Sequence, residues 1–365
     1  MLLWIMLLLF AAALGLGALY YLITRVRRFA FMTRLAEKNK FLSWLLAVSM
    51  VCLLFLFAVI NVYSVVIVVL HLALFWLICD LISALIHLIR KTSSRKYFAG
   101  ICALLLTAVY LGIGWVNAHH VRETDYSVST GKDVAPLRIA LIADSHLGIT
   151  LDGRSFQKEM DKIQKTQPDL IVVVGDFVDD DSTRADMLDA CRTLGNLKTT
   201  YGTYFTFGNH DSGYFRQRDF TAAELRKALT DNGITILEDE LVPLGENYLL
   251  VGRKDRSYPS RLPAEELLNH DSGRYTIVLD HQPNDYAAEA NAGADLVLSG
   301  HTHGGHIFPA GLIGLWMHAN DALYGMSHRS GTTFIITSGI SGWAIPFKTG
   351  TFSEYVIIDI RPELS

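Results

Sequence analysis

The sequence has few cysteines, and this limits the kinds of site that its polar part can form. Only four of the 365 residues are cysteine, and Cys52, Cys79 and Cys102 lie in apolar stretches. Cys191 alone remains for the polar part of the chain. That part therefore cannot hold a disulfide framework or a zinc or redox site of the CxxC type, and cysteine content does not decide the compartment.

Acidic residues are nearly absent from the first 118 positions, which hold ten Lys or Arg and only two Asp or Glu. The rest of the chain has 22 Lys or Arg and 34 Asp or Glu and is strongly acidic. Because nucleic-acid phosphates favour a basic surface, we expect no nucleic acid as a stable partner. An acidic part suits cation binding better, and 51% hydrophobic residues predict a membrane part plus one sizeable core.

Long uncharged runs predict a membrane domain over residues 1–118 with four transmembrane helices, since about 20 apolar residues cross a bilayer. Leu2–Thr24 has no charge and forms the first predicted span, and Phe98–Asn117 forms the fourth. Phe41–Ile89 contains a single charge and is too long for one crossing, so we expect two spans joined near residues 61–64. The first run has no basic residue before it, which argues against a cleaved signal peptide.

Basic residues in two short connections predict the orientation of these spans. Lys and Arg are concentrated in residues 25–40 and 90–96, so both connections are expected to be cytoplasmic. The chain is then an integral protein of the cytoplasmic (plasma) membrane, with everything after Asn117 extracytoplasmic. Asp80 lies near the middle of the third span with His87 on the same helix face, and we favour a hydrogen-bonded structural role for them over a functional polar site.

A layered α/β domain is predicted for residues 137–365, after a polar segment, 119–136, that we expect to be a linker. Short runs rich in Val and Ile alternate there with helical patterns, as is typical of such domains. Helices are expected at 156–165, 185–194 and 222–229. Strands are expected at 137–143, 170–174, 204–207, 248–251, 275–279, 296–298, 333–337 and 355–360.

Metal-type ligands follow the ends of five predicted strands, where open α/β sheets place their sites. The five segments are Asp144-Ser145-His146, Gly175-Asp176, Gly208-Asn209-His210-Asp211, Asp280-His281 and Gly300-His301-Thr302-His303-Gly304-Gly305. One histidine after a strand is more often a core or surface residue, but five such segments in succession are hard to obtain by chance. Seven oxygen or nitrogen ligands divide into two sets of four around a shared Asp176, and this mixture suits Mn, Fe or Zn rather than Ca.

The motifs DSH, GD, GNHD, DH and GHTHGG together resemble the calcineurin-like metallophosphoesterase superfamily, in particular its bacterial branch with a membrane anchor before the catalytic domain. The resemblance covers about residues 137–360. It implies a four-layer α-β-β-α sandwich, with two mixed sheets packed face to face between helices. It also implies two divalent metal ions: one held by Asp144, His146, Asp176 and His303, the other by Asp176, Asn209, His281 and His301.

The reaction that the resemblance implies is metal-dependent phosphoester hydrolysis, by a phosphomonoesterase or phosphodiesterase. Hydroxide activated by the metal pair attacks phosphorus, and His210 binds the phosphate and protonates the leaving oxygen as general acid. Asp211 stands where many members have Glu, and His306 stands where many in this branch have Gln. Neither departure removes a ligand, and His306 is either a further substrate contact or a surface histidine.

Two other segments bear on the substrate. The apolar stretch 312–317 either packs on the domain's own core, which we favour, or contacts the membrane or acyl chains. Four basic residues either form a solvated loop, which we favour, or lie near substrate phosphate; they are Arg253, Lys254, Arg256 and Arg261.

The leading hypothesis is hydrolysis of a phosphoester substrate, with a lipid-linked or membrane-proximal one favoured because the spans hold the site near the bilayer. Two alternatives remain open at this point. One is an extracytoplasmic phosphodiesterase for soluble nucleotides, and the other is a catalytically silent, metal-binding membrane sensor. The intact ligand set argues against the silent alternative.

Overall fold

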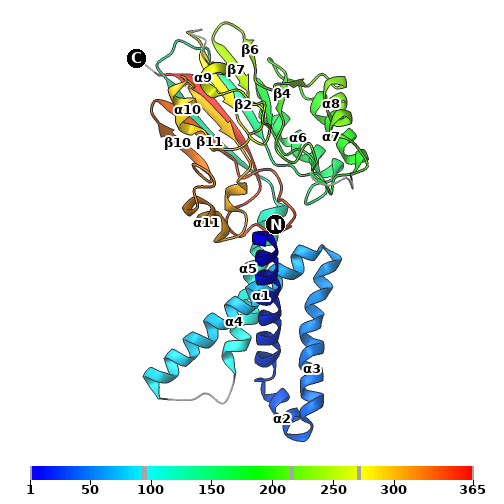
Figure 1. Ribbon diagram of the computed structural model, residues 1–365. Helices are drawn as coiled ribbons and strands as arrows, with labels where there is room; N and C mark the ends of the chain where they lie inside the picture. The colour runs from blue at the N-terminus through cyan, green and yellow to red at the C-terminus, as the bar shows by residue number, and fades with distance from the viewer. Residues whose placement is uncertain (1, 92–96, 214–217, 269–272, 364–365) are drawn as a thin grey trace. The chain divides into compact units, whose positions relative to one another are not determined.

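The computed structural model describes residues 2–91, 97–213, 218–268 and 273–363, with the side chains of the first helix described from Ala12 onward (Figure 1). The chain divides into two compact units, Met1–Ile113 and Gly114–Ser365. The division falls inside the last apolar helix, so the end of that helix belongs to the second unit.

The first unit is made of helices, as the long apolar runs predict. In chain order they are α1 (Leu2–Val26), α2 (Ala30–Lys38), α3 (Lys40–Cys52), the 3₁₀ helix η1 (Leu53–Val59), α4 (Val62–Arg90) and α5 (Phe98–His119). Among the described residues, three helical stretches are long and apolar enough to cross a membrane: Lys40–Val59, Val62–Arg90 and Phe98–His119.

The structure thus supports three spans where the sequence predicts four. In α1 the described apolar part is Ala12–Val26, and at about 1.5 Å per residue this part alone is too short to cross about 30 Å of hydrocarbon. The first span, predicted over Leu2–Thr24, depends on residues 2–11, whose side chains lie outside the described part, and it stays a prediction. The helix break expected near residues 61–64 is present, because Asn61 caps α4 by accepting a hydrogen bond from the Ser64 backbone N–H at 2.8 Å.

Asp80 on α4 is held by charged and hydroxyl groups inside the first unit. Its carboxylate lies 3.2 Å from Arg25 Nε and 3.3 Å from Arg28 Nη1. It also accepts hydrogen bonds from the hydroxyls of Tyr97 at 2.7 Å and Tyr21 at 3.2 Å. These contacts agree with the hydrogen-bonded structural role that the sequence favours for Asp80.

The second unit contains two mixed six-stranded sheets. The first has the order β1-β12-β2-β3-β4-β5, in which β12 is antiparallel to β2 and the other neighbours are parallel. Its strands are β1 (Arg122–Thr130), β2 (Leu137–Ile142), β3 (Leu170–Val174), β4 (Thr203–Thr206), β5 (Thr235–Ile236) and β12 (Glu354–Pro362). The second has the order β10-β11-β9-β8-β7-β6, from β6 (Glu240–Leu244), β7 (Tyr248–Gly252), β8 (Tyr275–Leu279), β9 (Leu296–Ser299), β10 (Gly325–Arg329) and β11 (Thr332–Ile336).

Helices cover the outer faces of the two sheets. Beside the first sheet lie α6 (Gly153–Lys165), α7 (Arg184–Gly195) and α8 (Ala222–Asp231), and α9 (Ala264–Leu268) and α10 (Tyr286–Asn291) lie beside the second. The inner faces pack on each other, because alternate residues of each strand point to the same side: Ile139 and Val172 share one core with Ile277 and Leu298. The predicted four-layer α-β-β-α sandwich is confirmed.

Part of the segment that we expect to be a linker, residues 119–136, forms a strand. β1 runs parallel to β12 from the pair Arg122 and Glu354 to the pair Thr130 and Pro362. β1 is an edge strand, and most of its side chains are exposed. Its sequence is therefore polar, which is why the pattern predicts a linker there.

Candidate metal centre and catalytic residues

The predicted site residues gather where the parallel strands of both sheets end. β2, β3 and β4 are parallel neighbours, as are β7, β8 and β9, so the loops after them share one edge of the sandwich. The loops after β2, β3 and β4 carry Asp144, Asp176 and His210, while those after β8 and β9 carry His281 and His301. Loops that are distant in the sequence can therefore contribute ligands to one position.

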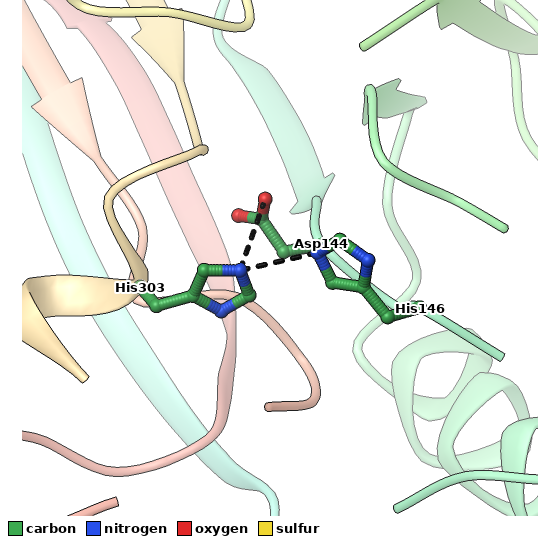
Figure 2. Close-up of side chains that lie close together, drawn as sticks. All are labelled: Asp144, His146 and His303. Carbon is green, nitrogen blue, oxygen red and sulfur yellow. Dashed lines mark hydrogen bonds and ion pairs between the residues drawn. The ribbon is translucent and has the colours of Figure 1, made fainter. Parts of the chain in front are cut away.

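Asp144, His146 and His303 form the first cluster of possible metal ligands (Figure 2). Nε2 of His303 lies 3.1 Å from Nε2 of His146 and 3.8 Å from Oδ1 of Asp144. Both carboxylate oxygens of Asp144 also accept the backbone N–H of His301 at 3.0 Å. Three buried side chains from two loops thus point their donor atoms at one position.

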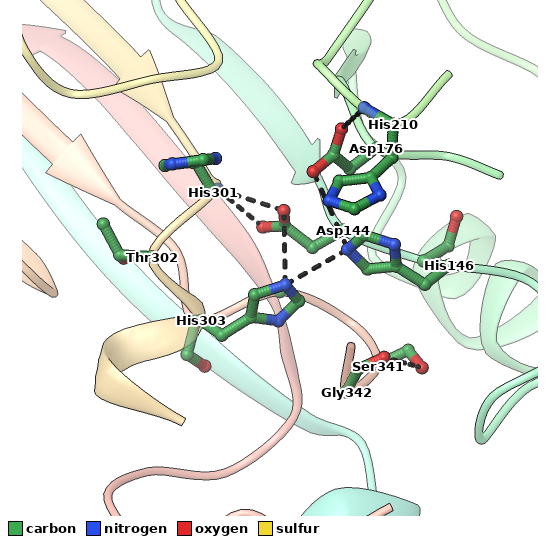
Figure 3. A network of polar contacts seen from close by, with 12 residues as sticks. Asp144, His146, Asp176, His210, His301, Thr302, His303, Ser341 and Gly342 are labelled. Carbon is green, nitrogen blue, oxygen red and sulfur yellow. Dashed lines mark hydrogen bonds and ion pairs between the residues drawn. The ribbon is translucent and has the colours of Figure 1, made fainter. Parts of the chain in front are cut away.

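Asp176, His281 and His301 form the second cluster. Oδ2 of Asp176 lies 3.1 Å from Nε2 of His281 and 3.7 Å from Nε2 of His146, which belongs to the first cluster. Asp176 therefore lies between the two clusters, as expected of a shared ligand (Figure 3). Asn209 adjoins this cluster through its neighbour His210, whose backbone N–H donates to Asp176 Oδ1 at 2.8 Å.

The donor atoms of these clusters fit a pair of cations. His281 donates its Nδ1 proton to the Val174 carbonyl at 2.9 Å, so its Nε2 lone pair faces the Asp176 carboxylate. Within the described residues, this buried Nε2 has no hydrogen-bond partner. Two lone pairs that face each other repel unless a proton or a cation lies between them, and the same holds for His146 and His303.

The carboxylates of the two clusters differ in pKa, although burial disfavours the ionised form of both. Burial raises the pKa of Asp144 to about 6. Burial also opposes the ionisation of Asp176, but the positive charge of His281, when a proton rather than a cation lies between the two side chains, holds the pKa of Asp176 below its usual range. Asp176 is therefore the carboxylate that is most firmly anionic, which suits a ligand shared by two cations.

Five of the seven predicted ligand residues have a left-handed backbone conformation. Such a conformation costs about 1–3 kcal/mol for a residue with a side chain, and it is concentrated at functional sites. The residues and their φ angles are Asp144 (55°), His146 (34°), Asp176 (51°), His301 (70°) and His303 (48°). The fold holds these residues in place against their own backbone preference.

Glycine is required at two positions beside Asp176. A Cβ atom on Gly208 would lie 2.2 Å from Asp176 Oδ1, and one on Gly175 would lie 2.5 Å from His281 Nδ1. Gly175 also has a φ of +75°. The glycines of the GD and GNHD motifs therefore let the two loops approach the shared carboxylate.

His210 lies beside the metal-type ligands and contacts a carboxylate that the motifs do not indicate. His210 Nδ1 lies 3.0 Å from Asp179 Oδ1, and the other oxygen of Asp179 lies 3.0 Å from His146 Nδ1. Burial opposes protonation of His210, but the hydrogen bond that His210 donates to Asp179 and the charge of Asp176 raise the pKa of His210. In the sequence, Asp179 could have been identified as a site residue because it lies three residues after Asp176, in the same loop.

Asp211 fixes the loops that carry Asp176 and His210. Its buried carboxylate accepts the backbone N–H groups of Asp176 and Gly208 on one oxygen, at 2.9 and 2.8 Å. The other oxygen accepts those of Phe177 and Val178 at 2.9 and 3.1 Å. The residue after His210 is thus structural, since four buried N–H groups depend on it.

A loop after β11 places Trp343 at the edge of the site. Trp343 belongs to none of the motifs that predict the other site residues. The loop is attached to the Asp144 segment, because Ser341 N–H donates to the Asp144 carbonyl at 3.2 Å. The Trp343 ring is 43% exposed, and its centroid lies 5.4 Å from that of His210. Trp343 is therefore a partly exposed aromatic ring next to His210 at the edge of the site.

His306 and Lys348 hold this loop from inside. His306 donates from Nε2 to the Ile345 carbonyl at 3.0 Å, and burial lowers the pKa of His306 to about 3. Lys348 is fully buried and donates from Nζ to the carbonyls of Ser338 and Gly339 at 2.7 and 3.1 Å. His306 is thus a loop-anchoring residue rather than a free surface histidine, and a substrate contact by it stays a prediction.

Two of the four basic residues after β7, Arg253 and Arg261, are not solvated as the sequence favours, whereas Arg256 is exposed. Arg253 is buried and lies 3.1 Å from Asp280 and 3.0 Å from Glu289. Arg261 contacts Asp280 and Asp285 at 2.5 and 3.1 Å. The network is internal because a buried guanidinium needs carboxylate partners, and it fixes Asp280, the residue before His281.

Comparison with known proteins agrees with this geometry. Residues 137–305 match the family model described as calcineurin-like phosphoesterase. A metallophosphoesterase of Aquifex aeolicus is 30% identical over 70% of this chain and 98% of its own length. One of Helicobacter pylori is 32% identical over 62% of this chain and 60% of its own length.

A Danio rerio protein described as a transmembrane protein with metallophosphoesterase domain is also similar, at 29% identity over 74% of this chain and 64% of its own length. The chain thus covers less than two thirds of the length of the Danio and Helicobacter relatives. Calcineurin-like phosphoesterases use a dinuclear divalent metal centre, and the two ligand clusters agree with one. The chain belongs to the calcineurin-like metallophosphoesterase family.

Proposed function

We propose that the chain is a membrane-anchored phosphoester hydrolase that uses two divalent metal ions. The main support is the position of Asp176, whose Oδ2 lies 3.1 Å from a histidine of one cluster and 3.7 Å from a histidine of the other. A carboxylate between two sets of imidazoles can bind two cations at once. Metal pairs of this kind promote in-line displacement at phosphorus.

The proposed ligands follow from the two clusters and their neighbours. Asp144, His146, Asp176 and His303 would hold one cation, and Asp176, Asn209, His281 and His301 would hold the other. The clusters support six of these seven residues directly. Asn209 is included because it adjoins the second cluster and its amide oxygen accepts from Gln282 Nε2 at 3.5 Å, which gives that oxygen a fixed partner.

The protein's own residues would position the phosphoester and deliver a proton. When bound, the two cations neutralise charge on the phosphoryl oxygens and lower the pKa of water so that hydroxide is supplied for attack. His210 donates its Nδ1 proton to Asp179, which orients the ring so that Nε2 can protonate the leaving oxygen. Asp211 keeps the Asp176 and His210 loops together while this occurs.

Hydrolysis of an activated substrate by the full-length protein tests this function. Purified protein with added Mn, Fe or Zn is expected to hydrolyse p-nitrophenyl phosphate or bis(p-nitrophenyl) phosphate. A chelator should abolish turnover, and the metal should restore it, because the reaction depends on Lewis-acid chemistry. Protein that binds two metal equivalents but stays inert on both esters would instead support the silent sensor.

The pH profile of an Asp179→Asn variant should differ from that of the natural protein. His210 must be protonated to act as acid, so activity is present below its raised pKa and is lost as pH rises through it. Removing the Asp179 charge lowers the pKa of His210, and the alkaline limb of kcat should move to lower pH by about one unit. An unchanged limb, with metal content also unchanged, would contradict the proton role of this pair.

The orientation of the catalytic unit is proposed to be extracytoplasmic in the plasma membrane. The argument depends on the basic connection over residues 25–40 and on the one after α4, of which residues 92–96 lie outside the described part. If both connections are cytoplasmic, α5 ends on the other side whether three or four spans cross. A reporter fused after Ser365 should therefore be active outside the cytoplasm, and cytoplasmic activity would overturn the orientation.

A membrane-proximal phosphoester, including a lipid-linked one, is the substrate that this arrangement favours. The second unit begins within α5, so the catalytic unit follows the span directly in the chain. A screen of membrane extracts before and after treatment with metal-loaded enzyme is expected to show loss of a phosphate-containing lipid. Loss of soluble nucleotides alone would favour the phosphodiesterase alternative.

A further inference from the structure

Beside the site, the short helix α11 (Ala310–Trp316) presents a group of apolar side chains to the outside. None of its residues is buried, so the sequence-based preference for packing on the domain's own core is not met. Residues 307–317 contain no Asp, Glu, Lys or Arg. The most exposed apolar side chains are Phe308 (55%), Leu312 (55%), Ile313 (50%), Trp316 (81%) and Met317 (67%).

These five apolar side chains are each at least half exposed, although they lie within ten residues of one another in the sequence. Leu312, Ile313 and Trp316 recur at spacings of one and three, which puts them on one face of α11. Contiguous exposed apolar patches on soluble domains mark protein or membrane contacts. The elements attached to this segment indicate which of the two partners it meets.

The end of the membrane helix α5 is hydrogen-bonded to Lys348. The next residue, Thr349, is hydrogen-bonded to the start of the apolar stretch. Lys348 N–H donates to the Gly114 carbonyl at 2.8 Å, and Asn117 Nδ2 donates to the Lys348 carbonyl at 3.3 Å. One residue further on, Thr349 N–H donates to the His306 carbonyl at 2.9 Å, and Phe308 N–H donates to Thr349 Oγ1 at 3.0 Å. Within the second unit, two adjacent residues thus link the last turns of the span to the segment before α11.

The contacts continue along α5 and include an aromatic pair. Ser353 N–H donates to the Asn117 carbonyl at 2.8 Å, and the rings of Trp115 and Phe347 lie 5.4 Å apart. Trp115 is 36% exposed, and tryptophan is typical of the boundary between hydrocarbon and water. The end of α5 is therefore an attachment point of the catalytic unit, and its exposed tryptophan suits a membrane boundary.

We propose that α11, with Phe308 and Met317, lies in the interfacial layer of the same bilayer that α5 crosses. The apolar face would enter the boundary between headgroups and acyl chains, as amphipathic helices do when they lie on a membrane. An exposed tryptophan and an absence of charge suit that layer. We favour a bilayer over a protein as the partner of this face, because the segment before α11 is attached to a helix that crosses the bilayer.

This contact has a direct connection to the metal-type ligands. α11 follows the 3₁₀ helix η2 (His303–Gly305), and the two are so close that a Cβ on Gly311 would lie 2.4 Å from the Gly305 Cα. The ligand His303 and the membrane-contact helix are thus parts of one packed segment. If the proposed function holds, this places the site at the depth of lipid phosphates.

Site-specific fluorescence in vesicles tests the contact without requiring turnover. The full chain, without Cys52, Cys79 and Cys102, keeps only the buried Cys191 as an unreactive thiol. Leu312→Cys and Met317→Cys are labelled with an environment-sensitive fluorophore and placed in phosphatidylcholine vesicles with or without nitroxide-labelled lipid. The matched control is Lys227→Cys, an exposed position on α8, away from α11 in Figure 1.

The expected result is a blue-shifted emission at position 312 or 317 and several-fold stronger quenching by lipid nitroxide than at position 227. Emission at both 312 and 317 that is as water-like as at 227, and quenched only by a water-soluble nitroxide, would overturn the proposal. Failure of hydrolysis would leave this readout unaffected, so the membrane contact and the proposed function are tested separately.

Discussion

Replacing Asp176 with alanine is expected to remove bound metal and activity together. Asp176 lies between the two ligand clusters, and its pKa is held low, so it supplies negative charge to both cation positions. Lewis-acid stabilisation is worth several kcal/mol, so kcat/KM should fall by roughly 10³-fold or more. Elemental analysis of the purified protein should show less metal than the two equivalents that we expect for the natural chain.

The matched control for this change is Asp189→Ala on α7, an aspartate whose side chain is 55% exposed. It should keep its metal and its rate. A thermal melt distinguishes loss of ligands from loss of the fold, since Asp176 also accepts the His210 backbone N–H. An Asp176→Ala protein that is folded, holds two metals and hydrolyses at the natural rate would exclude Asp176 as the shared ligand.

Replacing His210 with alanine should leave metal content unchanged and lower turnover. General acid catalysis typically contributes about 10²–10⁴-fold, and the loss should fall in that range for a substrate with a poor leaving group. p-Nitrophenolate is stable without a proton, so the loss on p-nitrophenyl esters should be much smaller. The measurement is kcat for a series of aryl and alkyl phosphoesters of increasing leaving-group pKa.

The control for this series is His120→Ala, a change of an exposed histidine near the end of α5. This change should not lower kcat for any ester of the series. If His210→Ala lowers kcat equally for all substrates, the residue binds phosphate but does not deliver the proton. If turnover is unchanged for every ester, His210 has no catalytic role.

Buried strands and ligand loops could be predicted from the sequence because the pattern that reveals them is local. Leu170–Val174 is wholly buried, so it is a run of apolar residues with no interruption. The metal-type ligands follow such runs directly, which made their meeting at one edge predictable from the topology of parallel strands. The four layers followed from the family resemblance that these motifs carry.

The positions of the residues that the sequence does not predict depend on contacts between distant parts of the chain. Asp179 meets His210 across 31 positions, and only the pairing of β3 with β4 brings them together. Trp343 follows no motif and reaches the site because its loop is attached to the Asp144 segment. The basic residues Arg253 and Arg261 looked solvated because their carboxylate partners lie on other elements.

The place of β1 in its sheet has a consequence for how the protein is made. β1 is the first strand after the membrane, and its sheet partner β12 is the last, with Glu123 opposite Tyr355, 232 positions later. At about 5–20 residues per second, the ribosome needs roughly ten to fifty seconds to supply that partner. The first strand after the spans therefore waits with an open edge, and its sheet is completed only when β12 has been made.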